Sequence, residues 1–360
     1  MLSNKSKKKI RIRDLAKLAN VSTGTVDRVL HNRGEVKEET KIKVLRIIDA
    51  MNYTPNLTAK ALASKKTFKL VILVPDSSDI NPYWEKPVLG INQAFNEISH
   101  FRTDVDIYTF DAYDEKSFEE MTIRILNEKP QGIIFNPVFF KASHAFIKKL
   151  EPLGIPYIFI DMNLKGASNI AYFGQEAFKS GYLSGKLMNF GLKCDSSLLI
   201  VKLADNRVIS RHIKNREKGF RAFFEHNTIR NCYNIFDLEI DLLEKEEPDK
   251  SLFEFLNKQK IDGIFVPNSR VFKLAQFFEN KKINDILLIG YDLIPQNIKY
   301  LEEEKINFLI GQRPEEQAYK ALKTLFNHIV LNKKVKKQNY SPIDIITKEN
   351  IEFYKEFRNE

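Results

Sequence analysis

From residue 67 onward, short apolar runs typical of β-strands alternate with amphipathic segments of helix length. This alternation predicts parallel sheets with helices on both faces, because a parallel crossover needs a connection long enough to hold a helix. The runs are more numerous than one doubly wound domain usually needs, so we expect two lobes, with ligands bound beyond the carboxyl ends of the strands. The expected strands are Leu70–Val74, Val105–Phe110, Gly132–Phe135, Tyr157–Ile160, Leu198–Val201, Asn234–Leu238, Gly263–Val266 and Ile286–Ile289, and the expected helices include Val88–Ile98, Lys179–Phe190 and Asn215–Glu225.

The excess positive charge of the chain precedes these strands. The formal net charge is +10, and residues 1–66 hold 16 Lys and Arg against 6 Asp and Glu, which accounts for all of it. A basic module attached to a neutral body is the charge distribution expected of a domain that contacts nucleic-acid phosphates.

Other features of the sequence favour a location in the cytoplasm. No apolar stretch reaches the roughly 18 residues that a membrane-spanning helix needs, and no apolar segment follows the lysine-rich N-terminus as a secretory signal requires. The two cysteines, Cys194 and Cys232, are too few for a disulfide framework and lack metal-ligand spacing, so we expect reduced thiols.

Within the basic segment, the apolar periodicity predicts three short helices. The first ends near Asn20, a residue that tolerates the left-handed cap conformation, and Ser22 or Thr23 can cap the second. A tight turn between the first two helices is typical of a helix-turn-helix domain, whose second helix enters the major groove of DNA. The apolar positions expected to pack together are Ile12, Leu15, Ala16, Leu18 and Ala19 in the first helix, Val26, Val29 and Leu30 in the second, and Ile42, Val44, Leu45, Ile47, Ile48 and Met51 in the third.

Two segments of this region carry a family resemblance. The run IRDLAKLANVSTGTVDRVL, residues 12–30, resembles the N-terminus of the LacI/GalR family of transcriptional regulators, the lactose and galactose repressors. The later run MNYTPNLTAKALA, residues 51–63, resembles the hinge of that family, in the same order and at the same separation. Asp27 departs from the pattern, because serine is usual at this position. Its carboxylate would either weaken nonspecific affinity for DNA or meet a particular base edge, and the sequence leaves both open.

The resemblance implies roles for residues of the second helix and the hinge. Thr23, Gly24 and Arg28 take base-reading positions, and the absence of a side chain on Gly24 would permit close approach or shift the reading to its neighbours. Hydroxyl side chains would contact phosphates, with helix capping as the alternative role. Leu62 matches the leucine that is wedged into the minor groove, with a packed linker leucine as the alternative. The implied DNA-binding residues are Ser22, Thr23, Gly24, Thr25, Arg28, His31, Thr40, Asn56, Ala59 and Leu62.

The loops after the expected strands resemble those of ribose-type periplasmic binding proteins and the matching regulatory domains. Carboxylate, guanidinium and amide groups can satisfy sugar hydroxyls, and aromatic rings can cover the apolar face of the sugar. Met162 replaces a frequent arginine, so the type of sugar stays open, and a nucleobase or another metabolite is the alternative effector. The implied ligand-binding residues are Asn81, Tyr83, Trp84, Asp161, Arg216, Asn268, Asp292 and Gln312.

Enzyme signatures are absent from the sequence, which has no phosphate loop, no dinucleotide-binding Gly-x-Gly-x-x-Gly, no His-Glu-x-x-His and no Gly-x-Ser-x-Gly. We therefore expect no catalytic residue, no metal site and no cofactor. A hydrolase that uses Asp161 and Asp292 as paired acids is one alternative, and only fold analogy supports it. A sugar-binding receptor without gene control is another, although it would leave the basic module without a use.

The chain is therefore expected to combine an all-α helix-turn-helix domain, residues 1–52, with a hinge, residues 53–66, and a two-lobed α/β domain of periplasmic-binding-protein type, residues 67–360. We expect lobe 1 at about 67–170 plus 296–325 and lobe 2 at about 171–292 plus 326–350. The resemblance implies a homodimer that binds near-palindromic, double-stranded operator DNA. Ligand would close the lobes and change operator affinity, in a direction that the sequence leaves open.

Overall fold

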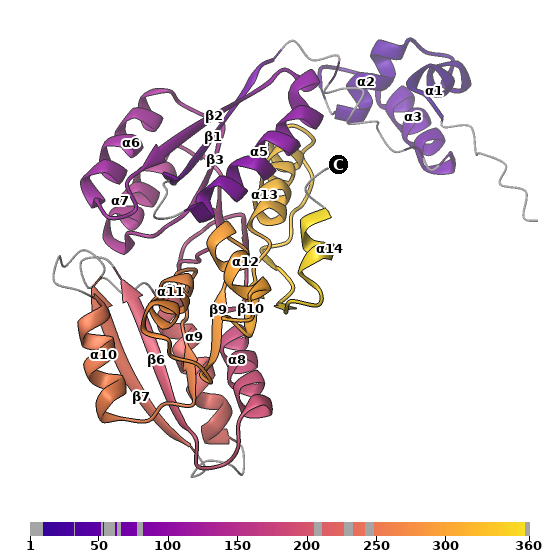
Figure 1. Cartoon of the computed structure of the whole chain (residues 1–360). Helices are drawn as coiled ribbons and strands as arrows, with labels where there is room; N and C mark the ends of the chain where they lie inside the picture. Colours follow the sequence, from indigo (N-terminus) through magenta and orange to yellow (C-terminus); the bar gives the residue numbers. More distant parts are fainter. Residues whose placement is uncertain are drawn as a thin grey trace, which may run out of the picture. The chain divides into compact units, whose positions relative to one another are not determined.

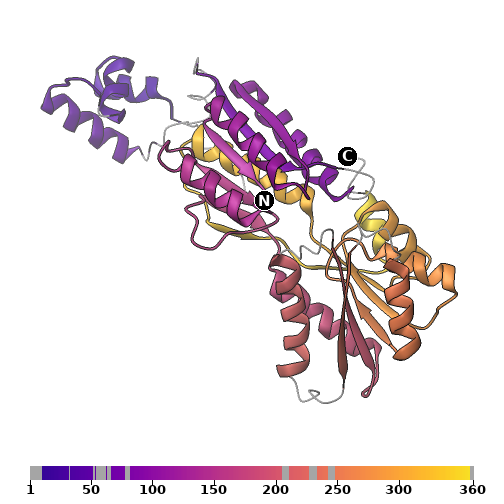
Figure 2. The same cartoon turned by 90° about the vertical axis from the view of Figure 1, so that its left-hand side faces the viewer.

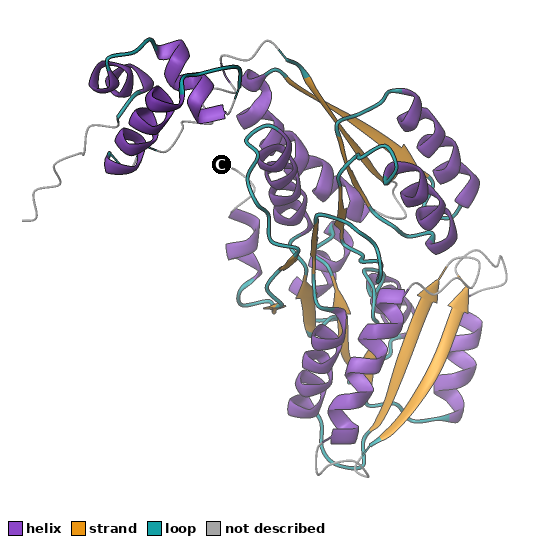
Figure 3. Ribbon diagram, turned by 180° about the vertical axis from the view of Figure 1, so that it is seen from behind, coloured by secondary structure: helices purple, strands orange, loops and turns teal. Residues whose placement is uncertain are grey.

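The chain is seen here in a computed structural model that describes residues 10–31, 33–51, 53, 62, 66–77, 82–204, 211–226, 233–241 and 248–356. It divides into two compact units, Met1–Ala63 and Ser64–Glu360. The described part of the first unit contains only helices and connecting loops, whereas the second combines helices with two sheets (Figures 1 and 3).

The N-terminal unit has the three predicted helices, α1 (Ile12–Ala19), α2 (Thr23–His31) and α3 (Glu38–Ala50). Asn20 ends α1 in the left-handed conformation, with φ of 53°. Ser22 caps α2, because its Oγ accepts a hydrogen bond from the backbone N–H of Thr25 at 3.1 Å. The two helices joined by this tight turn pack on α3 around one apolar core, which consists of Leu15, Ala16, Ala19, Val26, Val29 and Val44.

The predicted apolar stripes were wrong at four positions of this unit. Leu18 on α1 is 54% exposed, and Ile42, Leu45 and Met51 are also exposed. Ile42 lies two residues before Val44, which turns it by about 200° around the helix, away from the core face. The apolar spacing therefore predicted a buried face on α3 that is wider than the observed one.

Lobe 1 of the second unit is built on a six-stranded sheet in the order β11-β5-β4-β3-β1-β2, with every neighbouring pair parallel. Helices α6 and α7 share an apolar core with one face, and α5 and α13 pack against each other, with α13 also contacting β3, β4 and β5. The strands are β1 (Phe68–Pro75), β2 (Thr103–Phe110), β3 (Gly132–Phe135), β4 (Tyr157–Ile160), β5 (Ala171–Gly174) and β11 (Gln338–Tyr340), and the helices are the short 3-10 turns Pro82–Trp84 and Ser99–Phe101, α5 (Glu85–Ile98), α6 (Glu115–Asn127), α7 (Phe140–Leu150) and α13 (Pro314–Ile329).

Lobe 2 repeats this architecture with the order β12-β10-β9-β8-β6-β7, except that β12 pairs antiparallel with β10. Figure 2 shows both sheets of the second unit with helices packed along them. The strands are β6 (Ser197–Ala204), β7 (Asn234–Asp241), β8 (Gly263–Phe265), β9 (Leu287–Tyr291), β10 (Phe308–Gly311) and β12 (Asp344–Ile346), and the helices are α8 (Ala177–Gly191), α9 (Arg211–His226), α10 (Pro248–Lys258), α11 (Phe272–Lys281), α12 (Pro295–Glu302) and α14 (Ile351–Glu356).

The division of the chain between the lobes differs from the predicted one. β5 belongs to the sheet of lobe 1, whereas α12 and β10 belong to lobe 2, and β11 returns to lobe 1. The chain therefore crosses between the lobes after β5, after β10 and after β11. The predicted segments 296–325 and 326–350 were wrong because they assumed crossings near residues 296 and 326.

Two further properties bear on the expected setting of the protein. Cys194 is disulfide-bonded, so the expectation of reduced thiols was wrong for this residue, while Cys232 lies outside the described residues. Over the described ranges, every helix is too short or too polar to cross a membrane.

Candidate functional site

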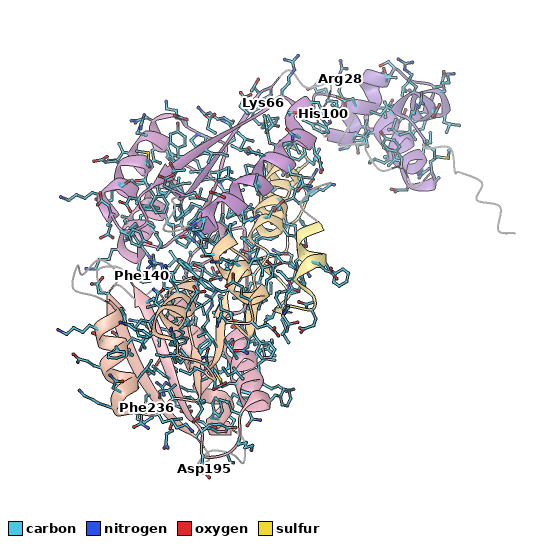
Figure 4. All side chains as sticks on the ribbon, viewed as in Figure 1. Arg28, Lys66, His100, Phe140, Asp195 and Phe236 are labelled. Carbon is cyan, nitrogen blue, oxygen red and sulfur yellow. The ribbon has the colours of Figure 1, made fainter. Side chains whose placement is uncertain are left out.

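A cavity of about 210 Å³ lies between the two lobes, at the carboxyl ends of their strands. In Figure 4, Phe140, which follows β3, lies where lobe 1 faces lobe 2, and Asp195, which precedes β6, lies at the far tip of lobe 2. The carboxyl ends of both sheets therefore face the crevice in which ligands of open α/β sheets bind. The lining residues are Pro75, Tyr83, Trp84, Ala112, Tyr113, Asn136, Val138, Phe139, Asp161, Met162, Leu203, His212, Ile213, Arg216, Asn268, Ser269, Arg270, Asp292 and Gln312.

Lobe 1 contributes a polar group centred on Asp161, which follows β4 in the left-handed conformation with φ of 63°. Its Oδ1 accepts a hydrogen bond from the Tyr83 hydroxyl at 3.1 Å, and its Oδ2 accepts one from Nδ2 of Asn136 at 3.1 Å. The Tyr83 ring packs edge-on against Trp84, with ring centroids 5.2 Å apart. These contacts fix the carboxylate while leaving further acceptor capacity on both of its oxygens.

Lobe 2 contributes a second polar group centred on Arg216 of α9, which is only 3% exposed. Its guanidinium lies over the Tyr291 ring at 3.9 Å and donates hydrogen bonds to the Pro267 carbonyl at 2.9 Å and to Oε1 of Gln312 at 2.5 Å. The Gln312 amide in turn donates to both carboxylate oxygens of Asp292, at 2.8 and 3.0 Å. The hydrogen bonds from Arg216 to Gln312 and from Gln312 to Asp292 therefore hold a guanidinium and a carboxyl group on the same side of the cavity.

Close packing of α8 on α9 places Arg216 at the cavity. A Cβ on Gly181 would lie 1.9 Å from the Arg216 carbonyl oxygen, and a Cβ on Gly219 would lie 1.9 Å from the carbonyl oxygen of Phe178. Any side chain at either glycine would therefore push the two helices apart. Residues 216–219 thus supply both the cavity arginine and the glycine that allows α9 to pack closely against α8.

Burial governs the ionisation of the groups in this cavity. It raises the pKa of Asp292 to about 7, against the opposing effects of Arg216 and of the hydrogen bond from Gln312. Burial also raises the pKa of Asp161, again opposed by Arg216. Burial, together with the nearby Arg216, lowers the pKa of His212 to about 3, so this imidazole is neutral near pH 7. The site therefore holds the Arg216 guanidinium beside two carboxyl groups, Asp161 and Asp292, whose pKa values are raised by burial.

Seven of the eight residues predicted to bind ligand line this one cavity, and the eighth, Asn81, lies outside the described residues. Sequence reasoning missed several lining residues, among them Asn136, Tyr113 and Arg270. Asn136 directly follows an expected strand, so the same strand-end rule would have found it. Tyr113 and Arg270 lie further along, in the loops after β2 and β8, and the Arg270 guanidinium donates a hydrogen bond to the Tyr113 hydroxyl across the two lobes.

The residues predicted to contact DNA are spread over α2, its N-terminal cap, α3 and the hinge. Thr23, Gly24 and Arg28 are exposed, while Thr25 is half-buried. Ser22 is exposed and Thr40, in the first turn of α3, is half-buried. Leu62 is helical and 49% exposed. The side chain of His31 and all of Asn56 and Ala59 lie outside what the structure describes.

Asp27 lies on the exposed side of α2 and close enough to Tyr53 to affect it. Burial raises the pKa of the Tyr53 hydroxyl, and the charge of Asp27 adds to the effect. Asp27, the residue that departs from the family pattern, therefore lies near Tyr53, the first residue of the predicted hinge. Elsewhere, the described part of the chain brings together no cluster of His, Cys, Asp and Glu of the kind that holds a metal ion.

Comparisons with known proteins match both units. Residues 11–56 match the lacI family of bacterial regulatory proteins, and residues 71–334 match the periplasmic binding protein domain. The HTH-type transcriptional regulator DegA of Bacillus subtilis is 30% identical over 296 residues, which cover 79% of this chain and 82% of the relative. The ribose operon repressor of Halalkalibacterium halodurans is 27% identical over 289 residues, covering 79% and 80%. A Bacteroides fragilis protein solved as a LacI transcriptional regulator superposes with a TM-score of 0.76 at 31% identity, over 80% of this chain and 100% of the other.

Proposed function

Because this chain belongs to the lacI family of bacterial regulatory proteins, with a periplasmic binding protein domain behind its helix-turn-helix, we propose that it is a transcriptional repressor whose affinity for operator DNA is controlled by a monosaccharide bound between its lobes. The observation that carries the sugar assignment is the pair of polar groups in the cavity. One comes from lobe 1 and is centred on Asp161, and the other is centred on Arg216 and Asp292.

This arrangement suits polyol recognition because each sugar hydroxyl both donates and accepts a hydrogen bond. The carboxylates of Asp161 and Asp292 keep acceptor capacity beyond the bonds that they make within the protein, so ligand hydroxyls can donate to both of them. The relative named as a ribose operon repressor is consistent with a sugar effector.

The proposed control of operator binding follows from the positions of the residues that would bind the sugar. A sugar that bonds to Asp161 in lobe 1 and to Arg216 in lobe 2 favours the closed arrangement of the lobes, and only this difference in affinity shifts the equilibrium. In our proposal the protein is a homodimer on a near-palindromic operator, read by Thr23, Gly24 and Arg28 of each copy. A Cβ on Gly24 would meet only Ser22 Oγ at 3.7 Å, so the fold itself has room for a side chain there. The hinge around Leu62 would transmit the change between the units.

The effector can be tested by thermal stabilisation of the full-length protein against pentoses, hexoses, sugar acids, polyols and nucleobases. A ligand present at about 100 times its Kd adds about 2.7 kcal/mol to the free energy of unfolding. We expect at least one monosaccharide to raise the melting temperature, and to change binding of the protein to a duplex obtained by selection from random DNA. Stabilisation by a nucleobase alone would replace the sugar with the alternative effector, and failure to select any DNA sequence would contradict the repressor.

The raised pKa of Asp292 predicts that sugar affinity rises by about tenfold or more between pH 5.5 and pH 7.5. The unliganded carboxyl holds its proton up to pH about 7, whereas hydroxyl donors favour the ionised form, so binding below pH 7 must release a proton. Titration calorimetry in buffers of different pH measures this dependence. Asp292→Asn cannot ionise and should flatten the profile, and a flat profile in the unaltered protein would contradict the role of Asp292.

The raised pKa of Asp292 also determines how the stability of the ligand-free protein changes with pH. Asp292 ionises near its ordinary pKa of 3.8 in the unfolded chain but only near 7 in the folded one. The unfolded state therefore binds fewer protons between these values, and the contribution of Asp292 to the free energy of unfolding falls as the pH rises through this window.

A further inference from the structure

The ligand cavity has two chemically different ends, and the sheet order sets them apart. In lobe 1, β4 lies on one side of β3 while β1 and β2 lie on the other. In lobe 2, β9 and β10 lie on one side of β8 while β6 and β7 lie on the other. We call the side of β4, β9 and β10 the inner end of the cavity, and the side of β2 and the end of β6 the outer end. The Tyr83 hydroxyl and the Arg216 guanidinium belong to the inner end, because they bond to Asp161 and Gln312, and the Phe139 ring belongs to the outer end, because it packs on Phe110 at the end of β2.

The inner end has hydrogen-bonding capacity that the protein does not use. Asp161 follows β4, Asp292 follows β9 and Gln312 follows β10, so the carboxyl groups described above gather here. The carboxylates of Asp161 and Asp292 keep acceptor capacity beyond the bonds that they make within the protein. This end is therefore suited to hydroxyl groups, which can satisfy donors and acceptors at once.

The outer end has an apolar surface, with the polar side chains of Tyr113, His212, Asn268, Ser269 and Arg270 beside it. Phe139 is anchored in the core of lobe 1, with its ring centroid 6.0 Å from that of Phe110 and 5.9 Å from that of Phe118. Leu203 is 2% exposed at the end of β6. An apolar surface of this kind gains by burial of a methyl group and offers no bond to a hydroxyl. The apolar lining residues of the outer end are Pro75, Ala112, Val138, Phe139, Leu203 and Ile213.

Polar side chains beside this apolar surface are bonded within the protein. Nδ2 of Asn268 donates to the Leu203 carbonyl at 2.6 Å, and its Oδ1 accepts from the backbone N–H of Arg270 at 3.1 Å. The Arg270 guanidinium donates to the Tyr113 hydroxyl of the opposite lobe and lies 5.7 Å from the centroid of its ring. The polar groups beside the apolar surface therefore already have partners in the protein, whereas the inner end offers carboxylate oxygens that can accept from ligand hydroxyls.

From this division we infer that the effector is a deoxy sugar, a monosaccharide whose ring hydroxyls face the inner end and whose methyl group, in place of a hydroxymethyl, faces the outer end. The inference rests on the proposed function, since it specifies the ligand of the same cavity. Burying a hydroxyl without a partner carries a penalty that a methyl group avoids, and the apolar lining adds a gain for the methyl group. The volume of about 210 Å³ suits a single sugar ring with a small substituent.

The test compares sugars that differ only at this group. Binding to the full-length protein is measured by calorimetry for L-rhamnose against L-mannose, L-fucose against L-galactose and D-fucose against D-galactose. In the pair that binds most tightly, we expect the deoxy sugar to bind at least about tenfold more tightly, the effect of one such group in a fitted pocket. Equal or tighter binding of the hydroxymethyl sugar would overturn the inference while leaving the proposed function intact. If no monosaccharide binds, the sugar effector and this inference fail together.

A pair of variants at Val138 locates the methyl subsite independently of absolute affinity. Val138→Thr keeps the shape of the side chain but adds a hydroxyl to the outer end, and it should reduce the preference for the deoxy sugar several-fold. Val138→Ala, the matched control, stays apolar and should keep the preference for the deoxy sugar. The melting temperature without ligand verifies that both variants fold. An unchanged preference in Val138→Thr would show that the methyl group does not lie at the outer end.

Discussion

Replacing Arg216 with alanine is expected to lower sugar affinity about 100-fold or more and to abolish the response of operator binding to sugar. Arg216 is the buried cation of the cavity, and it holds Gln312, which in turn bonds to both oxygens of Asp292. Hydrogen bonds to charged groups contribute about 1.5–3 kcal/mol each, and truncating one partner of a buried network adds the cost of the groups left unpaired. Calorimetry with the sugar identified by the thermal panel measures the loss, and operator binding without sugar should persist.

Two further variants keep the Arg216 experiment decisive. Arg221→Ala lies on the same helix, where the arginine forms surface ion pairs with Glu217 and Asp237, and it should leave sugar affinity unchanged. Arg216→Lys retains the charge but loses the planar fork, and it should bind sugar weakly even if the alanine variant proves unstable. Sugar affinity that is normal in both Arg216 variants would show that the effector binds elsewhere.

The elements of the lobes were predictable where a strand is buried on both faces, as in Gly132–Phe135 and Tyr157–Ile160, which form β3 and β4 with the predicted bounds. Three of the strands absent from the expected set show where prediction from sequence fails. β5 (AYFG) and β10 (FLIG) are apolar runs of the same length as β3 and β4, so their length does not explain why they were missed, whereas β11 consists of Gln338, Asn339 and Tyr340, which carry no apolar signal. Their pairing depends on partners far away in the sequence, as when Gln338 of β11 pairs with Tyr172 of β5. Local periodicity does not contain that information.

The same limit explains the wrong lobe boundaries. A short apolar strand indicates that a sheet is present but not which of two sheets it joins, and β5 and β10 each immediately precede a crossing between the lobes. The site was more predictable than the topology, because residues that follow parallel strands gather at one edge whichever order the strands take. Asp161 and Asp292 illustrate this, since they follow strands at equivalent places in the two sheets and both adopt positive φ, of 63° and 72°. What the sequence did not reveal was the contact of Tyr113 with Arg270, which depends on how the lobes face each other.

Replacing Arg28 with alanine is expected to weaken binding to the selected operator about 5- to 150-fold, while changing binding to a scrambled duplex much less. Arg28 is exposed on α2, whose opposite face is held in the core by Val26 and Val29, so its guanidinium is free to reach base edges if α2 enters the major groove. A guanidinium that bonds to guanine in two places contributes about 1–3 kcal/mol of discrimination against other bases. Fluorescence anisotropy with the two duplexes, at one fixed salt concentration, gives both affinities.

Arg46→Ala is the matched control for this prediction, because Arg46 is an exposed arginine of the same unit that lies on α3 instead of α2. It removes the same charge and should lower affinity for both duplexes by a similar, smaller factor, since a phosphate contact carries no sequence information. The ratio of the two affinities thus separates base reading from charge attraction. An Arg28→Ala protein that loses affinity equally for selected and scrambled DNA would place Arg28 on the phosphates and leave base reading to Thr23 and the other residues of α2.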